Sequence, residues 1–175
     1  GEVIDFELTE QMDVADFRQR LQEQLSDTLP IYEVEEVDIK APSATKALEH
    51  ADYLLAITAQ EDHRPSLWQQ WIDQILATDE ISDTHTTKSG KVKQINLRER
   101  LNTLEIVPEL PNSLPPSVLN RLSSGDATVV RYVGSCRNDG NMLRPEQLLR
   151  MLERQQEEAN PLHLVHVHRQ QLRLK

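Results

Sequence analysis

The chain has 175 residues, a formal net charge of −10 and one cysteine, Cys136. One thiol excludes an internal disulfide framework, and it cannot by itself hold an iron–sulfur cluster or another cofactor that needs several cysteine ligands. The longest purely apolar run, residues 53–57, is far shorter than the ~20 residues that cross a bilayer. No signal-peptide pattern opens the chain. We therefore expect a cytoplasmic domain with no membrane partner.

The two halves of the chain differ strongly in charge. Residues 1–87 contain 20 acidic and 5 basic residues, whereas residues 88–175 contain 9 acidic and 14 basic residues. This asymmetry orients an anionic partner onto the second half, or it merely lets the two halves attract each other. The sequence leaves both interpretations open.

The first 100 residues predict alternating strands and helices. Apolar residues at helical spacing predict the clearest helix over residues 65–77, with Trp68 and Trp71 on its core face. Period-2 alternation, capping residues and glycine turns predict the other elements. In chain order these are strand 3–8, helix 14–25, strand 31–39, a helix from Ser43 to about residue 51, strand 53–59 and a β-hairpin over 80–97 around Gly90. This order is typical of a ferredoxin-like βαββαβ lobe with an antiparallel sheet.

The remaining residues predict a second lobe, of βαβ type, over 101–175. A proline-rich loop over 108–116 and a polar loop over 134–141 interrupt it. Its expected elements are strand 104–107, helix 117–122, strand 127–133, a helix from Arg144 and strand 162–172. We expect an α+β fold in which lobe 101–175 packs on lobe 1–100 as one unit.

Four short motifs occur in order along the chain. They are KAPS at 40–43 with ADY at 51–53, GKVKQINLR at 90–98, GSCRNDGNMLRPEQLL at 134–149, and HR at 168–169. Together they resemble the radical-SAM-linked C-terminal domain called domain of unknown function 2344.

The resemblance implies an accessory domain of a radical S-adenosylmethionine protein, often behind a cobalamin-binding region. It implies no cofactor in this domain, and an iron–sulfur cluster, S-adenosylmethionine and cobalamin in the parent. The upstream radical SAM domain of the same chain is the implied partner. Cys136 and Asn96 depart from the family pattern, where a small residue and an aspartate are usual, so a role for that carboxylate is in doubt.

The polar loop before the helix that starts at Arg144 suggests an anion site. Glycines let the backbone approach a ligand, the helix N-terminus favours an anion, and arginines add charge-assisted contacts. The alternative is a plain connecting turn. The candidate residues are Gly134, Ser135, Arg137, Gly140, Asn141, Arg144 and Arg169.

Nucleic-acid binding is a second possibility, because the hairpin and the residues behind it are basic. The candidates for an RNA contact are Lys88, Lys91, Lys93 and Arg98. Few aromatic residues accompany them, so a stacking platform for single strands is missing.

Metal and nucleophile chemistry is weakly indicated. On a strand, His166 and His168 share one face while His163 lies on the other, which leaves only two ligands. Cys136 has no neighbouring base in the sequence. We therefore expect no catalytic residue and no metal site, and we expect a non-catalytic substrate- or partner-binding domain, with RNA docking as the alternative.

Overall fold

The computed structural model describes residues 2–59, 65–86, 90–123, 125–137, 141–156 and 161–175. They form two units, one of Glu2 with residues 45–175 and one of residues 3–44. Each unit is described by itself.

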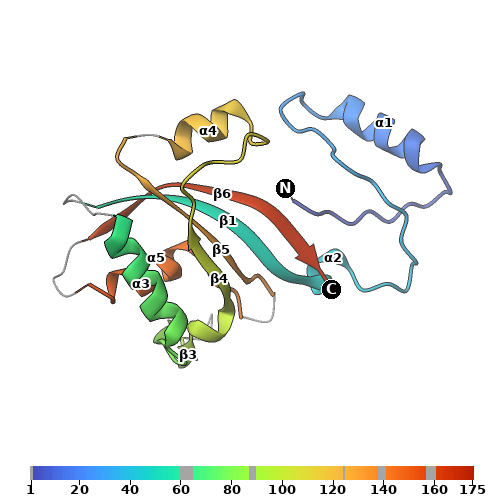
Figure 1. Ribbon diagram of the computed structural model, residues 1–175. Helices are drawn as coiled ribbons and strands as arrows, with labels where there is room; N and C mark the ends of the chain where they lie inside the picture. The colour runs from blue at the N-terminus through green and yellow to red at the C-terminus, as the bar shows by residue number, and fades with distance from the viewer. Residues whose placement is uncertain (1, 60–64, 87–89, 124, 138–140, 157–160) are drawn as a thin grey trace. The chain divides into compact units, whose positions relative to one another are not determined.

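The larger unit is built on a four-stranded antiparallel sheet in the order β4-β5-β1-β6 (Figure 1). Its strands are β1 (Leu48–Ala59), β4 (Leu101–Ile106), β5 (Thr128–Ser135) and β6 (Leu162–Leu174). The central strands β1 and β5 are rich in leucine, isoleucine and valine, which suits strands that have neighbours on both sides. The outer strands β4 and β6 each have one free edge in the part of the chain that the structure describes.

Two helices cover one face of this sheet, α3 (Pro65–Ala77) and α5 (Pro145–Glu153) (Figure 1). Their apolar faces pack on the side chains of the strands and form the main hydrophobic core. Trp68 and Trp71 belong to this core, as the sequence predicted, with their rings edge to face at 5.3 Å. Tyr53 of β1 stacks on Tyr132 of β5 at a centroid distance of 5.0 Å.

The opposite face carries a smaller core beneath helix α4 (Pro116–Leu122) (Figure 1). Leu54 and Ala56 of β1 and Val129 of β5 pack there against Leu114 and Leu122. Strand alternation explains the split, because neighbouring residues of β1 and β5 point to opposite faces. This second core covers one end of the face only.

A β-hairpin forms a separate two-stranded sheet from β2 (Ser82–Thr86) and β3 (Val92–Asn96). Gly90 lies in the turn with a φ of +79°, a backbone region that favours glycine. Asp83 of β2 joins the hairpin to α5 through ion pairs with Arg150, at 2.9 Å, and Arg154, at 3.3 Å. A short 3-10 helix, η1 (Arg98–Arg100), leads from the hairpin into β4.

The smaller unit contains helix α1 (Val14–Gln24) between two segments without regular structure. Asp13 caps α1 by accepting a hydrogen bond from the N–H of Ala15, as predicted. Phe17 of α1 packs edge to face on Phe6, and the carboxylate of Asp5 accepts from the N–H of Ala44. No residue of α1 is buried.

The predicted α+β class with an antiparallel sheet and an added hairpin is confirmed. Two predicted strands, residues 3–8 and 31–39, are not formed, because neither segment has a strand beside it to complete a hydrogen-bonded ladder. The prediction of a helix from Ser43 to about residue 51 is also wrong in its length. Helix α2 spans only Ala44–Ala47, and β1 takes over at Leu48.

The ferredoxin-like order expected within residues 1–100 is therefore not present. Of the four strands in the main sheet, only β1 precedes residue 100. The boundary expected between residues 100 and 101 falls at the start of β4, inside the larger unit.

Candidate functional site

A row of four charged side chains crosses the sheet on the face that carries α4. Arg131 donates from Nε to Oδ1 of Asp52 at 3.0 Å and from Nη2 to Oδ2 at 2.6 Å. Its Nη1 donates to Oε1 of Glu105 at 3.4 Å. Arg173 lies on the other side of Asp52, with 3.7 Å between its Nη2 and Oδ2. The row thus runs from β4 through β5 and β1 to β6.

The strand register places these residues together. Glu105 lies directly opposite Arg131, while Leu54, two residues beyond Asp52 on the same face, is the partner of Arg131 on β1. On the other side of β1, Arg173 is the partner of His50, again two residues from Asp52. Side chains in diagonal positions of a sheet are within reach when they are long, as arginine is.

The carboxylate at the centre of the row is buried, whereas the two guanidinium groups beside it are accessible. The side chain of Asp52 is 2% exposed, whereas those of Arg131 and Arg173 are 38% and 50% exposed. The hydrogen bond with Asp52 is the largest of the effects that raise the pKa of Arg131. The buried carboxylate therefore orients two guanidinium groups at the surface of the sheet, and such groups suit carboxylate or phosphate partners.

The glycine and serine that the sequence placed in a ligand loop lie inside β5. Gly134 is paired with Ala51 and Leu101. A Cβ at Gly134 would lie 3.0 Å from Cε2 of Tyr132 and 3.2 Å from Cβ of Leu143, so close packing explains the glycine. Ser135 is buried, and among the described residues its hydroxyl has no hydrogen-bond partner.

The base of the loop is held by its own backbone. The N–H of Leu143 donates to the carbonyl of Ser135 at 2.8 Å, and the carbonyl of Leu143 accepts from the Tyr132 hydroxyl at 3.3 Å. Arg100 donates to the carbonyl of Met142 at 3.0 Å. These contacts fix the two ends of the connection between β5 and α5.

The predicted arginines of the anion site lie on three different segments, namely the end of the loop after β5, the N-cap of α5 and strand β6. Arg137 and Asn141 are exposed at the two ends of the loop, and Gly140 lies outside the described residues. Arg144 is exposed at the N-cap of α5, where its N–H donates to Oε1 of Gln147. Arg169 of β6 forms an ion pair with Glu2.

The N-terminus of α5 is also a poor anion site on electrostatic grounds. Pro145 supplies no N–H, and Glu146 puts a negative charge in the first turn.

Cys136 follows β5 and is buried, with its N–H donating to the carbonyl of Glu49 at 3.0 Å. Burial raises the pKa of its thiol, although the charge of Arg169 acts in the opposite direction. A thiol with a raised pKa is a poor nucleophile at neutral pH.

The candidate nucleic-acid residues differ in accessibility. Lys91 and Lys93 are exposed on the hairpin, and Lys88 lies outside the described residues. The side chain of Arg98 forms hydrogen bonds within the larger unit. It donates from Nη1 to the carbonyl of Leu101 at 2.9 Å and from Nη2 to that of Leu76 at 3.3 Å.

Asn96 has a structural role that an aspartate could not reproduce. Its Oδ1 accepts from the N–H groups of Ile81 and Arg98, each at 3.0 Å. Its Nδ2 donates to the carbonyl of Asp79 and to the carboxylate of Glu99. A carboxylate supplies no donor for these last two contacts.

Strand β6 carries three histidines, His163, His166 and His168. His166 and His168 have lowered pKa values, chiefly because they are partly buried. Among the residues that the structure describes, no group of three histidine, cysteine or carboxylate side chains could hold a metal ion.

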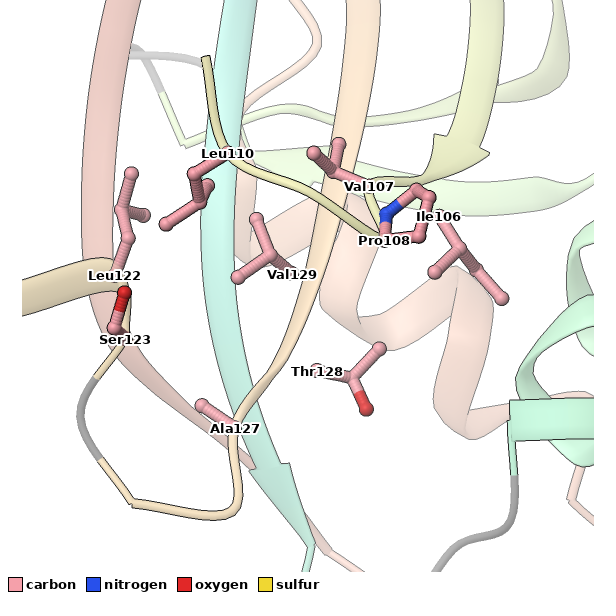
Figure 2. Close-up of a pocket in the computed structure, with 9 residues that line it drawn as sticks. All are labelled: Ile106, Val107, Pro108, Leu110, Leu122, Ser123, Ala127, Thr128 and Val129. Carbon is pink, nitrogen blue, oxygen red and sulfur yellow. The ribbon is translucent and has the colours of Figure 1, made fainter. Parts of the chain in front are cut away.

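A pocket lies at the other end of the same face, between the end of β4, α4 and the start of β5 (Figure 2). Side chains of Ile106, Val107, Leu110, Leu122 and Val129 line it, with Ser123 and Thr128 as its hydroxyl-bearing residues. It borders the small core under α4, with which it shares Leu122 and Val129.

The charged row was missed by the sequence analysis, although a signal was present. Asp52 and Arg131 interrupt strands that are otherwise apolar, in the runs ADYLLA and TVVRYV. A charge in a buried strand needs a partner of opposite sign. The pairing itself depends on the register between β1 and β5, which the sequence does not reveal.

The fold and these contacts define an α+β domain whose antiparallel sheet carries a charged row on one face. The chain belongs to the family described as "Uncharacterized protein conserved in bacteria (DUF2344)", which matches residues 1–145. A search of curated proteins and a search of solved structures found no match. In the described part of the chain, every helix is too short or too polar to cross a membrane.

Proposed function

We propose that this chain is a non-catalytic accessory domain that binds a substrate or partner for a radical S-adenosylmethionine enzyme. The four sequence motifs support the link to radical enzymes, because they resemble the domain that accompanies them. The parent protein would supply the iron–sulfur cluster, S-adenosylmethionine and, where present, cobalamin. Family membership fits this proposal without naming an activity.

The pair of guanidinium groups around Asp52 carries the binding part of the proposal. The side chain of Arg173 makes one loose ion pair, at 3.7 Å, and no hydrogen bond to another described side chain or backbone group. Most of its N–H donors are therefore available to an anionic group of a ligand. Because the buried carboxylate holds Arg131 in place, little side-chain entropy is lost when a ligand binds.

Inorganic phosphate and malonate are simple probes of this site. We expect both to shift the NMR signals of the Arg131 side chain and of amides in β5 and β6. Arg173→Gln should weaken the binding about tenfold, as expected for the loss of a charge-assisted hydrogen bond. Lys93→Gln, which removes an exposed charge of the separate β2–β3 hairpin, is the matched control and should leave binding unchanged.

The intact parent protein tests the accessory role. Arg173→Gln should lower product formation but leave cluster content and substrate-independent cleavage of S-adenosylmethionine unchanged. Turnover of a substrate by the isolated chain would overturn the proposal. So would equal phosphate and malonate affinities in Arg173→Gln and the unaltered chain.

RNA docking remains a second candidate because Lys91 and Lys93 are exposed on the hairpin. This candidate requires RNA affinity that falls steeply with salt. The absence of binding at low salt would remove it.

A further inference from the structure

Residues 31–39 resemble a strand that lacks a sheet. Tyr32 and Ile39 are 78% and 84% exposed, and Val37 is also exposed. Around them lie four carboxylates and no basic residue, namely Glu33, Glu35, Glu36 and Asp38. Large apolar side chains at a strand-like spacing are normally covered by a neighbour.

The backbone of this segment is also open. Ile31 is tied to α1, since its N–H donates to Oε1 of Gln22 at 2.8 Å and its carbonyl accepts from Arg18 at 3.0 Å. From residue 32 to residue 37, no backbone group forms a hydrogen bond with another described residue. An open backbone is suited to strand addition, and the apolar side chains here alternate on either side of the Glu35–Glu36 step, where a bulge would fit.

The outer edge of β6 has the complementary properties. It is the last strand of the sheet and spans thirteen residues. Residues 162–175 contain no carboxylate side chain, and they include three histidines, two arginines and Lys175. Val165 and Val167 are exposed on this strand. A long free edge is a ready template for another strand.

We propose that residues 31–39 of one copy of this chain add as a strand to the outer edge of β6 of a second copy. Opposite charges select this pairing, because the acidic segment meets an edge without carboxylates. Both complementary elements are on the same chain, which favours a second copy over an unrelated protein. Each copy donates one segment and accepts another, so the assembly closes as a two-fold dimer.

Light scattering after size-exclusion chromatography tests this dimer over a range of concentrations. The unaltered chain should shift from monomer to dimer as concentration rises. Glu33→Lys with Glu35→Lys should raise the dissociation constant about tenfold or more, because like charges then face each other. Glu109→Lys with Asp126→Lys, which reverses two exposed charges of the larger unit, is the matched control and should leave it unchanged.

A charge swap separates specific pairing from misfolding. A second variant, His163→Glu with Lys175→Glu, makes the edge of β6 acidic and should also associate with itself more weakly than the unaltered chain. Mixed in equal amounts, the two altered chains should restore a heterodimer through the reversed charges. Failure of the mixture to associate, when circular dichroism shows both chains folded, would overturn the proposal.

Isotope mixing identifies the occupant of the edge. A carbodiimide joins carboxylates to the Lys175 amine, and copies labelled with ¹⁵N are mixed with unlabelled copies before coupling. We expect cross-linked peptides that combine residues 31–39 of one label with residue 175 of the other. A chain that stays monomeric at every concentration, or cross-links found only within one label, would contradict the second-copy assignment.

Discussion

Several arginine side chains of this protein form hydrogen bonds with backbone carbonyl groups. Arg98 binds carbonyls at the end of α3 and the start of β4, and Arg100 binds the carbonyl of Met142. Helix ends and loops leave carbonyls without partners, and a guanidinium group can satisfy two of them. The sequence identified Arg98 as a surface cation because such contacts depend on which loop ends meet in space.

The close packing around Gly134 can be tested by a single substitution. In Gly134→Ala, the new methyl group would meet Tyr132 at 3.0 Å and Leu143 at 3.1 Å, and both residues are buried. We expect the free energy of unfolding to fall by about 1–3 kcal/mol, as for other overpacked cores. Urea denaturation followed by circular dichroism measures this loss.

The control for Gly134 is the double substitution with Leu143→Ala, which removes the Cδ2 atom that the methyl group would meet at 3.1 Å and keeps Cβ at 3.2 Å. Its cost should be smaller than the sum of the two single costs. Additive costs would show that the clash with Cδ2 of Leu143 is not the cause.

At the scale of elements, tertiary contacts separate the correct predictions from the wrong ones. The helix at 65–77 was predicted well because its apolar residues repeat at 3.6-residue spacing and pack on the core. Segment 3–8 has the alternation of a strand, and segment 31–39 has it with one break between Val34 and Val37, yet a strand exists only where a neighbour completes its ladder. Helix α5 and strand β5 were also predicted, but the contacts between them were not.

The ion pairs between Asp83 of the hairpin and the arginines of α5 predict that stability depends on pH. Burial alone would raise the pKa of Asp83, but the hydrogen bond from Arg150 and the nearby arginine charges outweigh it, so the pKa is lowered. A lowered pKa means that the carboxylate stabilises the fold above the ordinary pKa, and that this stability is lost as pH falls through the folded-state pKa. Asp83→Asn should therefore be less stable than the unaltered chain at pH 7, by about 0.5–1 kcal/mol.

Unfolding measured in urea between pH 7 and pH 3 checks this difference. It should be constant down to about pH 4 and then shrink as Asp83 is protonated. Asp73→Asn, on the exposed side of α3, provides a comparison outside the ion pairs with α5. A difference that grows as the pH falls would contradict the lowered pKa.

At the scale of the whole molecule, the buried core is concentrated in the larger unit. Every buried apolar residue of the described chain lies between Ala51 and Leu162, whereas residues 3–44 contribute none. The sequence could not show this imbalance, because segment 3–44 also has apolar residues at strand and helix spacing. Patterning indicates which side chains could be buried, and only the packing of neighbouring elements decides which ones are.

This imbalance predicts that residues 45–175 fold without the first 44 residues. A chain that begins at Thr45 should unfold cooperatively in urea, with a free energy of unfolding within about 1 kcal/mol of the full chain. The expected loss is small because residues 3–44 contribute no buried apolar side chain, and because the Arg169–Glu2 ion pair within the larger unit lies at the surface, where such pairs contribute little. Arg169→Gln in the full chain measures that contribution separately.

The concentration of protein decides how this comparison is interpreted. Below the dissociation constant of the proposed dimer, both chains are monomers, and equal stability follows from the position of the core alone. Above it, the shortened chain lacks residues 31–39, so the full chain should gain stability with concentration while the shortened chain does not. Non-cooperative unfolding of the shortened chain at low concentration would show instead that residues 2–44 are required for the core to form.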